Sequence, residues 1–127
     1  MSMSFVSMLL LVCVGSGLGG ICRFLLAMLI KSPVDSFPLA TLVTNLIGCL
    51  CIGLFLGLSV KHHWLSKELQ SLLVTGFCGG FTTFSTFSNE ALTLLRSDAF
   101  LMFALYVGLS IIIGLCLVAL GYWLASM

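Results

Sequence analysis

Residues 76–90 read GFCGGFTTFSTFSNE, and no plain lipid-facing helix has such a sequence. The stretch carries the glycine pair Gly79-Gly80, five serine or threonine residues and four phenylalanines. Glycine is unfavourable in a helix interior and adopts conformations that other residues avoid. Midway through a membrane span, the pair predicts a break whose freed amides and carbonyls must face protein or a cavity, because lipid cannot bond to them. A glycine-rich packing face against another helix is the alternative.

The composition indicates that lipid surrounds most of the chain. Of its 127 residues, 61% are hydrophobic and 7% are charged, against about 25% charged residues in a typical soluble domain. A span needs about 20 mostly apolar residues, and four such stretches lie at about 5–30, 39–60, 69–95 and 100–125. The first lacks a basic start and a convincing cleavage site, so we expect a retained helix. We predict an all-α membrane protein with one transmembrane domain over residues 1–127 and a third helix broken near its centre.

Charge and cysteine usage argue against several classes of function. The formal net charge is +1 and no basic run occurs, which argues against nucleic acid as a partner. The six cysteines all fall in apolar stretches without the spacing of zinc ligands, as expected of small packed residues. The sequence shows no nucleophile–base set, carboxylate pair, phosphate loop or cofactor motif. We therefore expect no enzyme.

The basic residues give almost no orientation signal. With four spans, both termini lie on the same side as the connector that holds Lys61 and Lys67. The other side holds Lys31 and Arg96, with Arg23 close to it. Since an excess of basic residues marks the cytoplasmic side, this nearly even count predicts insertion in both orientations. Twofold symmetry is the commonest in homo-oligomers, so we expect an antiparallel, dual-topology homodimer; a bias beyond this count that fixes one orientation is the alternative.

Hydroxyl groups gather directly after the glycine pair. Thr83, Thr86 and Glu90 are spaced i, i+3 and i+7, which places them on one face of a helix. Each hydroxyl can donate one hydrogen bond, and an anion that sheds its water requires a line of such donors. Alternatively, serine and threonine bond back to carbonyls of their own helix.

Phenylalanines alternate with these hydroxyls. Phe77, Phe81 and Phe84 are spaced i, i+4 and i+7, and Phe87 follows Phe84 by three residues. An aromatic ring has a negative face and a positive edge, so the ring edges can contact an anion. Ordinary packing against lipid or a neighbouring helix is the alternative.

Three further polar residues lie within apolar stretches. Asn45 offers two N–H donors to an ion or, alternatively, a hydrogen bond that joins two helices. Arg23 and Glu90 are the ionisable residues that we expect at membrane depth, where charge is expensive. Arg23 could extend to the surface and raise the anion concentration at a pore mouth. Glu90 repels an anion unless it is paired or protonated, so we expect it at a wet vestibule; an interfacial anchor is the alternative for both.

The chain resembles the small bacterial fluoride channels of the Fluc or CrcB family. The likeness is strongest over residues 76–88, GFCGGFTTFSTFS, which match the family's third-helix signature almost letter for letter. It extends to residues 19–23, GGICR, to residues 41–48, TLVTNLIG, and to the four-helix layout of essentially the whole chain. Phe81 departs from the pattern, since many relatives carry leucine or another small or aliphatic residue there.

The resemblance implies a fluoride-selective channel that passively exports F⁻ across the bacterial inner membrane and reduces fluoride toxicity in the cytoplasm. Similar proteins are antiparallel homodimers with two pores along the interface between the subunits. The residues that resemble pore positions are Asn45, Phe84, Phe87, Thr86, Ser85, Thr83, Tyr106, Arg23 and Glu90. Gly79 and Thr82 resemble the positions whose backbone carbonyls, from both subunits, hold a structural Na⁺ at the dimer centre. The implied partners are fluoride, sodium, the lipid bilayer and a second copy of the chain.

Two rival functions are compatible with a small membrane protein. A small multidrug exporter would also be a four-helix, dual-topology dimer, but it requires a carboxylate early in its first helix, and residues 5–30 contain none. A purely structural assembly protein would use residues 76–90 for packing alone. Fluoride efflux from proteoliposomes distinguishes all three functions.

Overall fold

The computed structural model describes residues 3–33, 36–63 and 65–127, and the regular elements in these ranges are all helices. Three of them, α1, α2 and α6, are long and apolar enough to cross a membrane. The predictions of an all-helical fold and of long apolar helices are confirmed. The elements are α1 (Phe5–Leu29), α2 (Leu39–His62), α3 (Lys67–Leu69), the π-helix η1 (Gln70–Cys78), α4 (Gly79–Phe81), α5 (Phe84–Arg96) and α6 (Phe100–Ser126).

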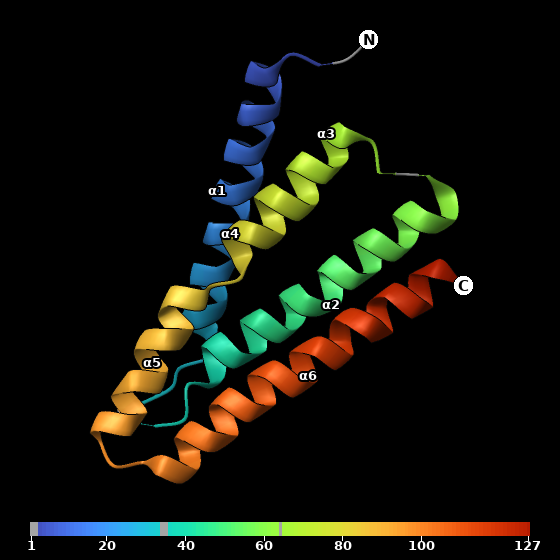
Figure 1. Cartoon of the computed structure of the whole chain (residues 1–127). Helices are drawn as coiled ribbons and strands as arrows, with labels where there is room; N and C mark the ends of the chain where they lie inside the picture. The colour runs from blue at the N-terminus through green and yellow to red at the C-terminus, as the bar shows by residue number, and fades with distance from the viewer. Residues whose placement is uncertain (1–2, 34–35, 64) are drawn as a thin grey trace.

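The helices form two closely packed pairs (Figure 1). Helix α6 runs beside α2 over most of their length, while α1 lies against η1 and α4. Helix α5 continues beyond α4 toward the connector that leads into α6. A small core, formed by Leu42, Ala91, Leu94 and Tyr106, lies where α2, α5 and α6 meet.

Glycines allow the backbones within each pair to approach closely. A Cβ atom added at Gly19 would overlap the carbonyl oxygen of Phe77, and one added at Gly53 would overlap the carbonyl oxygen of Val118. Membrane helices associate through small residues of this kind, because close van der Waals packing holds them together in lipid. Gly19 therefore packs α1 against η1, and Gly53 packs α2 against α6.

We expect Gly19→Ala to destabilise the protein by roughly 1–3 kcal/mol, because the added methyl group forces a backbone shift at an already packed contact. Gly17→Ala, on the same helix, is the matched control, since a Cβ atom at Gly17 meets nothing within 4 Å. Thermal unfolding in detergent, followed by circular dichroism, measures both variants. Equal unfolding temperatures for the two would contradict the packing described.

The chain leaves helical geometry three residues after the position that the glycine pair predicts. Gly79 and Gly80 are helical within α4. The extended residues are Thr82, with φ −82° and ψ 158°, and Thr83, with φ −148° and ψ 121°. The prediction that the glycine pair itself opens the helix is therefore wrong. A Cβ atom at Gly80 would overlap the carbonyl oxygen of Ser16, so this glycine serves close packing instead.

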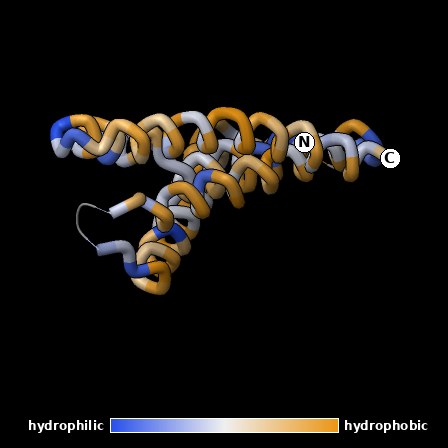
Figure 2. The backbone as a smooth tube through the Cα atoms, turned by 90° about the horizontal axis from the view of Figure 1, so that it is seen from below, coloured by the Kyte–Doolittle hydropathy of each residue, from blue (hydrophilic) through white to orange (hydrophobic). Residues whose placement is uncertain are grey.

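The outer surface of the helices is largely apolar. Leu29 is 81% exposed, and Leu101 and Leu115 are each 74% exposed. Figure 2 shows hydrophobic residues along all the helices. A helix that is hydrophobic all round belongs in a large core or in lipid, and a chain of this size offers no large core. Lipid is therefore the medium that surrounds these helices.

Candidate functional site

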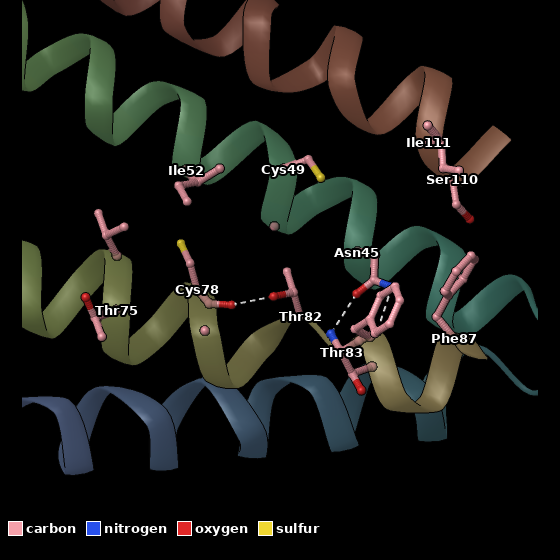
Figure 3. Close-up of a pocket in the computed structure, with 14 residues that line it drawn as sticks. Asn45, Cys49, Ile52, Thr75, Cys78, Thr82, Thr83, Phe87, Ser110 and Ile111 are labelled. Atoms are coloured by element: carbon pink, nitrogen blue, oxygen red, sulfur yellow. Dashed lines mark hydrogen bonds between the residues drawn. The ribbon is translucent and has the colours of Figure 1, made fainter. Parts of the chain in front are cut away.

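The candidate site is built around the extended residues between α4 and α5. The side-chain amide of Asn45, on α2, bonds to both backbone groups of Thr83 (Figure 3). The Thr83 N–H donates to Asn45 Oδ1 at 2.8 Å, and Asn45 Nδ2 donates to the Thr83 carbonyl at 3.1 Å. A break in lipid is tolerable only when its backbone groups find partners. Asn45 supplies two of them, which leaves one amide N–H for another acceptor.

Hydroxyl groups satisfy further backbone groups at the break. The Thr82 N–H and hydroxyl both donate to the carbonyl oxygen of Cys78, at 3.0 and 2.8 Å. The Thr83 hydroxyl accepts from the Thr86 N–H at 3.3 Å, which caps the start of α5, and donates to the Thr86 hydroxyl at 3.0 Å. Because Thr86 Oγ1 accepts that bond, its own hydrogen remains for another acceptor.

Arg23 bonds to the end of α4 instead of extending to the surface. Its Nε donates to the carbonyl oxygen of Gly80 at 3.2 Å. The helical partner of that carbonyl would be the N–H of Phe84, which lies beyond the break. A cation is favoured at the carbonyl end of a helix, so Arg23 stabilises the interruption from the side of α1.

At the break, the Thr82 carbonyl has no partner among the hydrogen bonds found within the described residues. The Thr83 N–H, which would pair with the Gly79 carbonyl in a continuous α-helix, bonds to Asn45 Oδ1 instead. Gly79 and Thr82 line the same groove, and Gly79 is exposed. Neutral carbonyl oxygens are suitable ligands for a hard cation. Within the described ranges no three His, Cys, Asp or Glu side chains gather to hold a metal. The donor set at this point thus fits an alkali cation held by backbone oxygens.

A groove of about 470 Å³ opens beside the break, between α2, η1, α5 and α6. Its walls are mostly apolar, and its polar groups include Asn45, Thr83 and Ser110. Phe84 lines it and is 80% exposed, with its ring centroid 5.9 Å from that of Phe87. The groove therefore presents aromatic rings and hydroxyl groups together on an open side of the chain.

Ser110 is a polar groove residue that the sequence analysis missed. Its hydroxyl oxygen is buried and has no hydrogen-bond partner among the described residues. Buried polar groups are nearly always bonded, and each exception requires an explanation. The signal available in the sequence was a serine in the middle of the apolar stretch at residues 100–125.

A separate cavity of about 330 Å³ lies on the other side of the break, between α1, α2 and α5. Arg23, Glu90 and Thr86 line it. Thr83 lines both this cavity and the groove. The break therefore forms the boundary between two hollows, and one hollow holds a cation and a carboxylate.

The Glu90 carboxylate is held by two hydroxyl donors. Thr41 donates to its Oε1 at 2.8 Å, and Tyr106 donates to its Oε2 at 2.8 Å. Tyr106 is fully buried, and its ring centroid lies 5.1 Å from that of Phe87. Two hydroxyl groups thus pair with the Glu90 carboxylate, and Tyr106 links this carboxylate to the aromatic pair.

We expect Tyr106→Phe to lower the stability by roughly 1.5–3 kcal/mol, because a part-buried carboxylate loses one of its two donors. Tyr122→Phe, at a half-exposed tyrosine of the same helix, is the control and should unfold like the wild type. Thermal unfolding in detergent measures both. An unchanged unfolding temperature for Tyr106→Phe would show that the bond to Glu90 contributes little.

The structure brings most of the predicted site residues together. Asn45, Thr83 and Thr86 meet at the break, and Ser85 is exposed there with its hydroxyl 3.5 Å from that of Thr83. Phe84 and Phe87 face the groove. Arg23 and Glu90 lie in the second cavity, while Tyr106 is buried behind Phe87. The predicted roles of these residues toward an ion stay predictions.

Comparisons with known proteins identify the family of the chain. A protein named fluoride-specific ion channel FluC from Azobacteroides pseudotrichonymphae is 43% identical over 117 residues, which cover 91% of this chain and 94% of the relative. The protein of the same name from Flavobacterium psychrophilum is 48% identical over 105 residues, covering 82% and 85%. The one from Phocaeicola vulgatus is 41% identical over 119 residues, covering 93% and 98%. The family described as CrcB-like protein, Camphor Resistance (CrcB), matches residues 10–122, and the chain belongs to this family.

Proposed function

We propose that the chain forms a fluoride-selective channel that lets F⁻ leave the cell passively, down its electrochemical gradient. The observation that carries the proposal is the break at Thr82 and Thr83, where hydroxyls, an amide and phenylalanine rings meet at a groove. The relatives named as fluoride-specific ion channels support the choice of ion. Fluoride that enters cells as HF from an acidic medium ionises in the cytoplasm, and such a channel reduces its toxicity.

The groups at the break suit an anion that has lost its water. Hydroxyls of Thr86 and Ser110 have hydrogens to donate, and the Asn45 amide retains one N–H. The positive edges of the Phe84 and Phe87 rings add favourable contacts that do not compete as hydrogen-bond acceptors. Because Thr83 lines both hollows, we propose that the ion passes it between the cavity and the groove.

The groove is open in a single chain, and we propose that an antiparallel second copy closes it. Phe84 is 80% exposed, so without a partner its ring, Gly79 and the Thr82 carbonyl would face acyl chains. Lipid offers no partner to free carbonyls. A twofold axis through this surface would give two grooves, and hence two pores, along the interface. The nearly even distribution of basic residues supports insertion in both orientations.

A structural Na⁺ fits the same surface. The Gly79 and Thr82 carbonyls of the two copies would hold it at the dimer centre. Its positive charge would offset part of the cost of an anion in a medium of low dielectric constant. Sodium removal is expected to lower dimer stability without a change in the fold of each chain.

Fluoride efflux from proteoliposomes, measured with a fluoride electrode, tests the channel. We expect rapid efflux for the wild type and a loss of at least about tenfold for Phe84→Ile, which removes a positive ring edge from the ion path; tenfold in rate corresponds to about 1.4 kcal/mol. Phe5→Ile is the matched control, because Phe5 is an exposed phenylalanine at the start of α1, outside the groove. Undiminished efflux through Phe84→Ile would defeat the proposed role of the ring.

A further inference from the structure

Thr75 supplies a further hydroxyl group to the groove, at the end opposite Ser110. Thr75 belongs to η1, is exposed, and lines the groove. Figure 3 shows Thr75 far along the lining from Phe87 and Ser110. Among the side-chain hydrogen bonds found within the part of the chain that the structure describes, none involves the Thr75 hydroxyl.

Other hydroxyls in comparable places bond back to their own helix. Ser71 donates to the Lys67 carbonyl at 2.9 Å, and Thr93 donates to the Asn89 carbonyl at 2.9 Å. Serine and threonine within helices commonly use this bond to the carbonyl four residues earlier. Thr75 does not, although the carbonyl of Ser71 precedes it by four residues. Ser71 lies in the same π-helix as Thr75, so the helix type alone does not account for the difference.

The position of Thr75 makes a free hydroxyl costly in lipid. It lies eight residues after Lys67 in a segment that continues to Arg96, roughly 12 Å along the axis at a helical rise of about 1.5 Å per residue. An unbonded hydroxyl in an apolar medium costs about 1–3 kcal/mol on the protein scale. The group therefore requires an acceptor other than acyl chains, and the groove is where it is exposed.

The backbone around Thr75 is also unusual. π-Helices are rare, occur mostly as single turns and are frequent at functional sites. Here the π-helix covers nine residues, Gln70–Cys78, and leads directly into the short helix before the break. Two independent features, a rare backbone geometry and a free hydroxyl, thus converge on the far end of the groove.

We propose that the Thr75 hydroxyl contacts the permeating fluoride ion and extends the ion path from the phenylalanine pair to the other end of the groove. This inference rests on the proposed channel function. The hydroxyl donates its hydrogen to the anion there, as Ser110 and Thr86 do nearer the break. Between the two ends the lining is mainly apolar, with Ile52, Cys49 and Val74, so the wall excludes water where donors are absent.

Fluoride efflux from proteoliposomes with Thr75→Val tests the contact, because valine keeps the branched shape and removes only the hydroxyl. We expect efflux to fall about tenfold or more, the loss of one hydrogen bond to an ion, while Thr75→Ser stays within about twofold of the wild type. Thr75→Ala removes the hydroxyl together with the methyl group, and its efflux should equal that of Thr75→Val. Thr93→Val is the matched control, since its hydroxyl bonds to the Asn89 carbonyl away from the groove.

The oligomeric state of each variant, measured by cross-linking in the same liposomes, separates an ion contact from a contact between copies. An unchanged dimer fraction with reduced efflux supports the proposal. Wild-type efflux in Thr75→Val, or a loss that follows a loss of dimer, would overturn it while leaving the channel function in place. Absence of efflux from the wild type itself would instead refute the channel.

Discussion

An Asn45→Leu variant is expected to lose fluoride efflux entirely and to unfold more easily by roughly 2–6 kcal/mol. The substitution leaves the part-buried N–H and carbonyl of Thr83 without partners, and each unsatisfied group costs about 1–3 kcal/mol. It also removes the remaining amide N–H that the ion would meet. Fluoride-electrode recordings and thermal unfolding in detergent measure the two effects.

Asn89→Leu is the matched control for this substitution. Asn89 is exposed on α5 and lines neither the groove nor the second cavity, so the same change of side chain should leave efflux and stability near those of the wild type. Wild-type efflux in Asn45→Leu would show that the amide neither holds the break nor contacts the ion.

An Arg23→Gln variant is expected to lose about tenfold in efflux, because the Gly80 carbonyl loses a charge-assisted hydrogen bond worth about 1.5–3 kcal/mol. Two roles for Arg23 can be separated. If Arg23 stabilises the break, the efflux of Arg23→Lys should be as low as that of Arg23→Gln, since lysine keeps the charge but not the planar donor group. If Arg23 instead concentrates anions at a pore mouth, the efflux of Arg23→Lys should be close to that of the wild type.

The dependence of efflux on ionic strength provides a second test of the two roles with the same pair of variants. Attraction of anions from solution is screened by salt, with a screening length of about 10 Å at 0.1 M. A bond to the Gly80 carbonyl at 3.2 Å is screened much less. We expect the Arg23→Gln defect to persist at high salt; full recovery there, together with full rescue by lysine, would contradict the role at the break.

The all-helical architecture was predictable because it depends on local composition. Runs of about 20 apolar residues fit only a membrane or a large core, and the chain has too few residues for the latter. The family is also visible in the sequence, through residues 76–88. As a member of that family, with three helices able to span a bilayer, the chain is a multi-pass protein of the bacterial inner membrane and not an enzyme.

The exact residues of the break were not predictable from local preferences. Glycine is the weaker helix former, yet Gly80 is helical because its missing side chain admits the backbone of Ser16, 64 residues earlier. Thr83 is extended because Asn45, 38 residues earlier, bonds to both of its backbone groups. Contacts of such long range override intrinsic propensity.

The hydrogen-bond partners of Arg23 and Glu90 could not be predicted for the same reason. Sequence analysis placed Arg23 and Glu90 at membrane depth, but it could not show that one bonds to the Gly80 carbonyl and the other accepts from Thr41 and Tyr106. Tyr106 entered the predictions only through the family resemblance. Its hydroxyl bonds to the Glu90 carboxylate, which explains why a polar ring is tolerated in the core where α2, α5 and α6 meet.

Passive fluoride conduction is tested most directly by wild-type liposomes with equal fluoride on both sides and an imposed potassium diffusion potential. We predict that fluoride moves toward the positive side and that the direction of the flux reverses when the potential is reversed. Fluoride that stays in the liposomes until detergent opens them would contradict passive conduction. A flux whose direction does not change with the sign of the potential would contradict it as well.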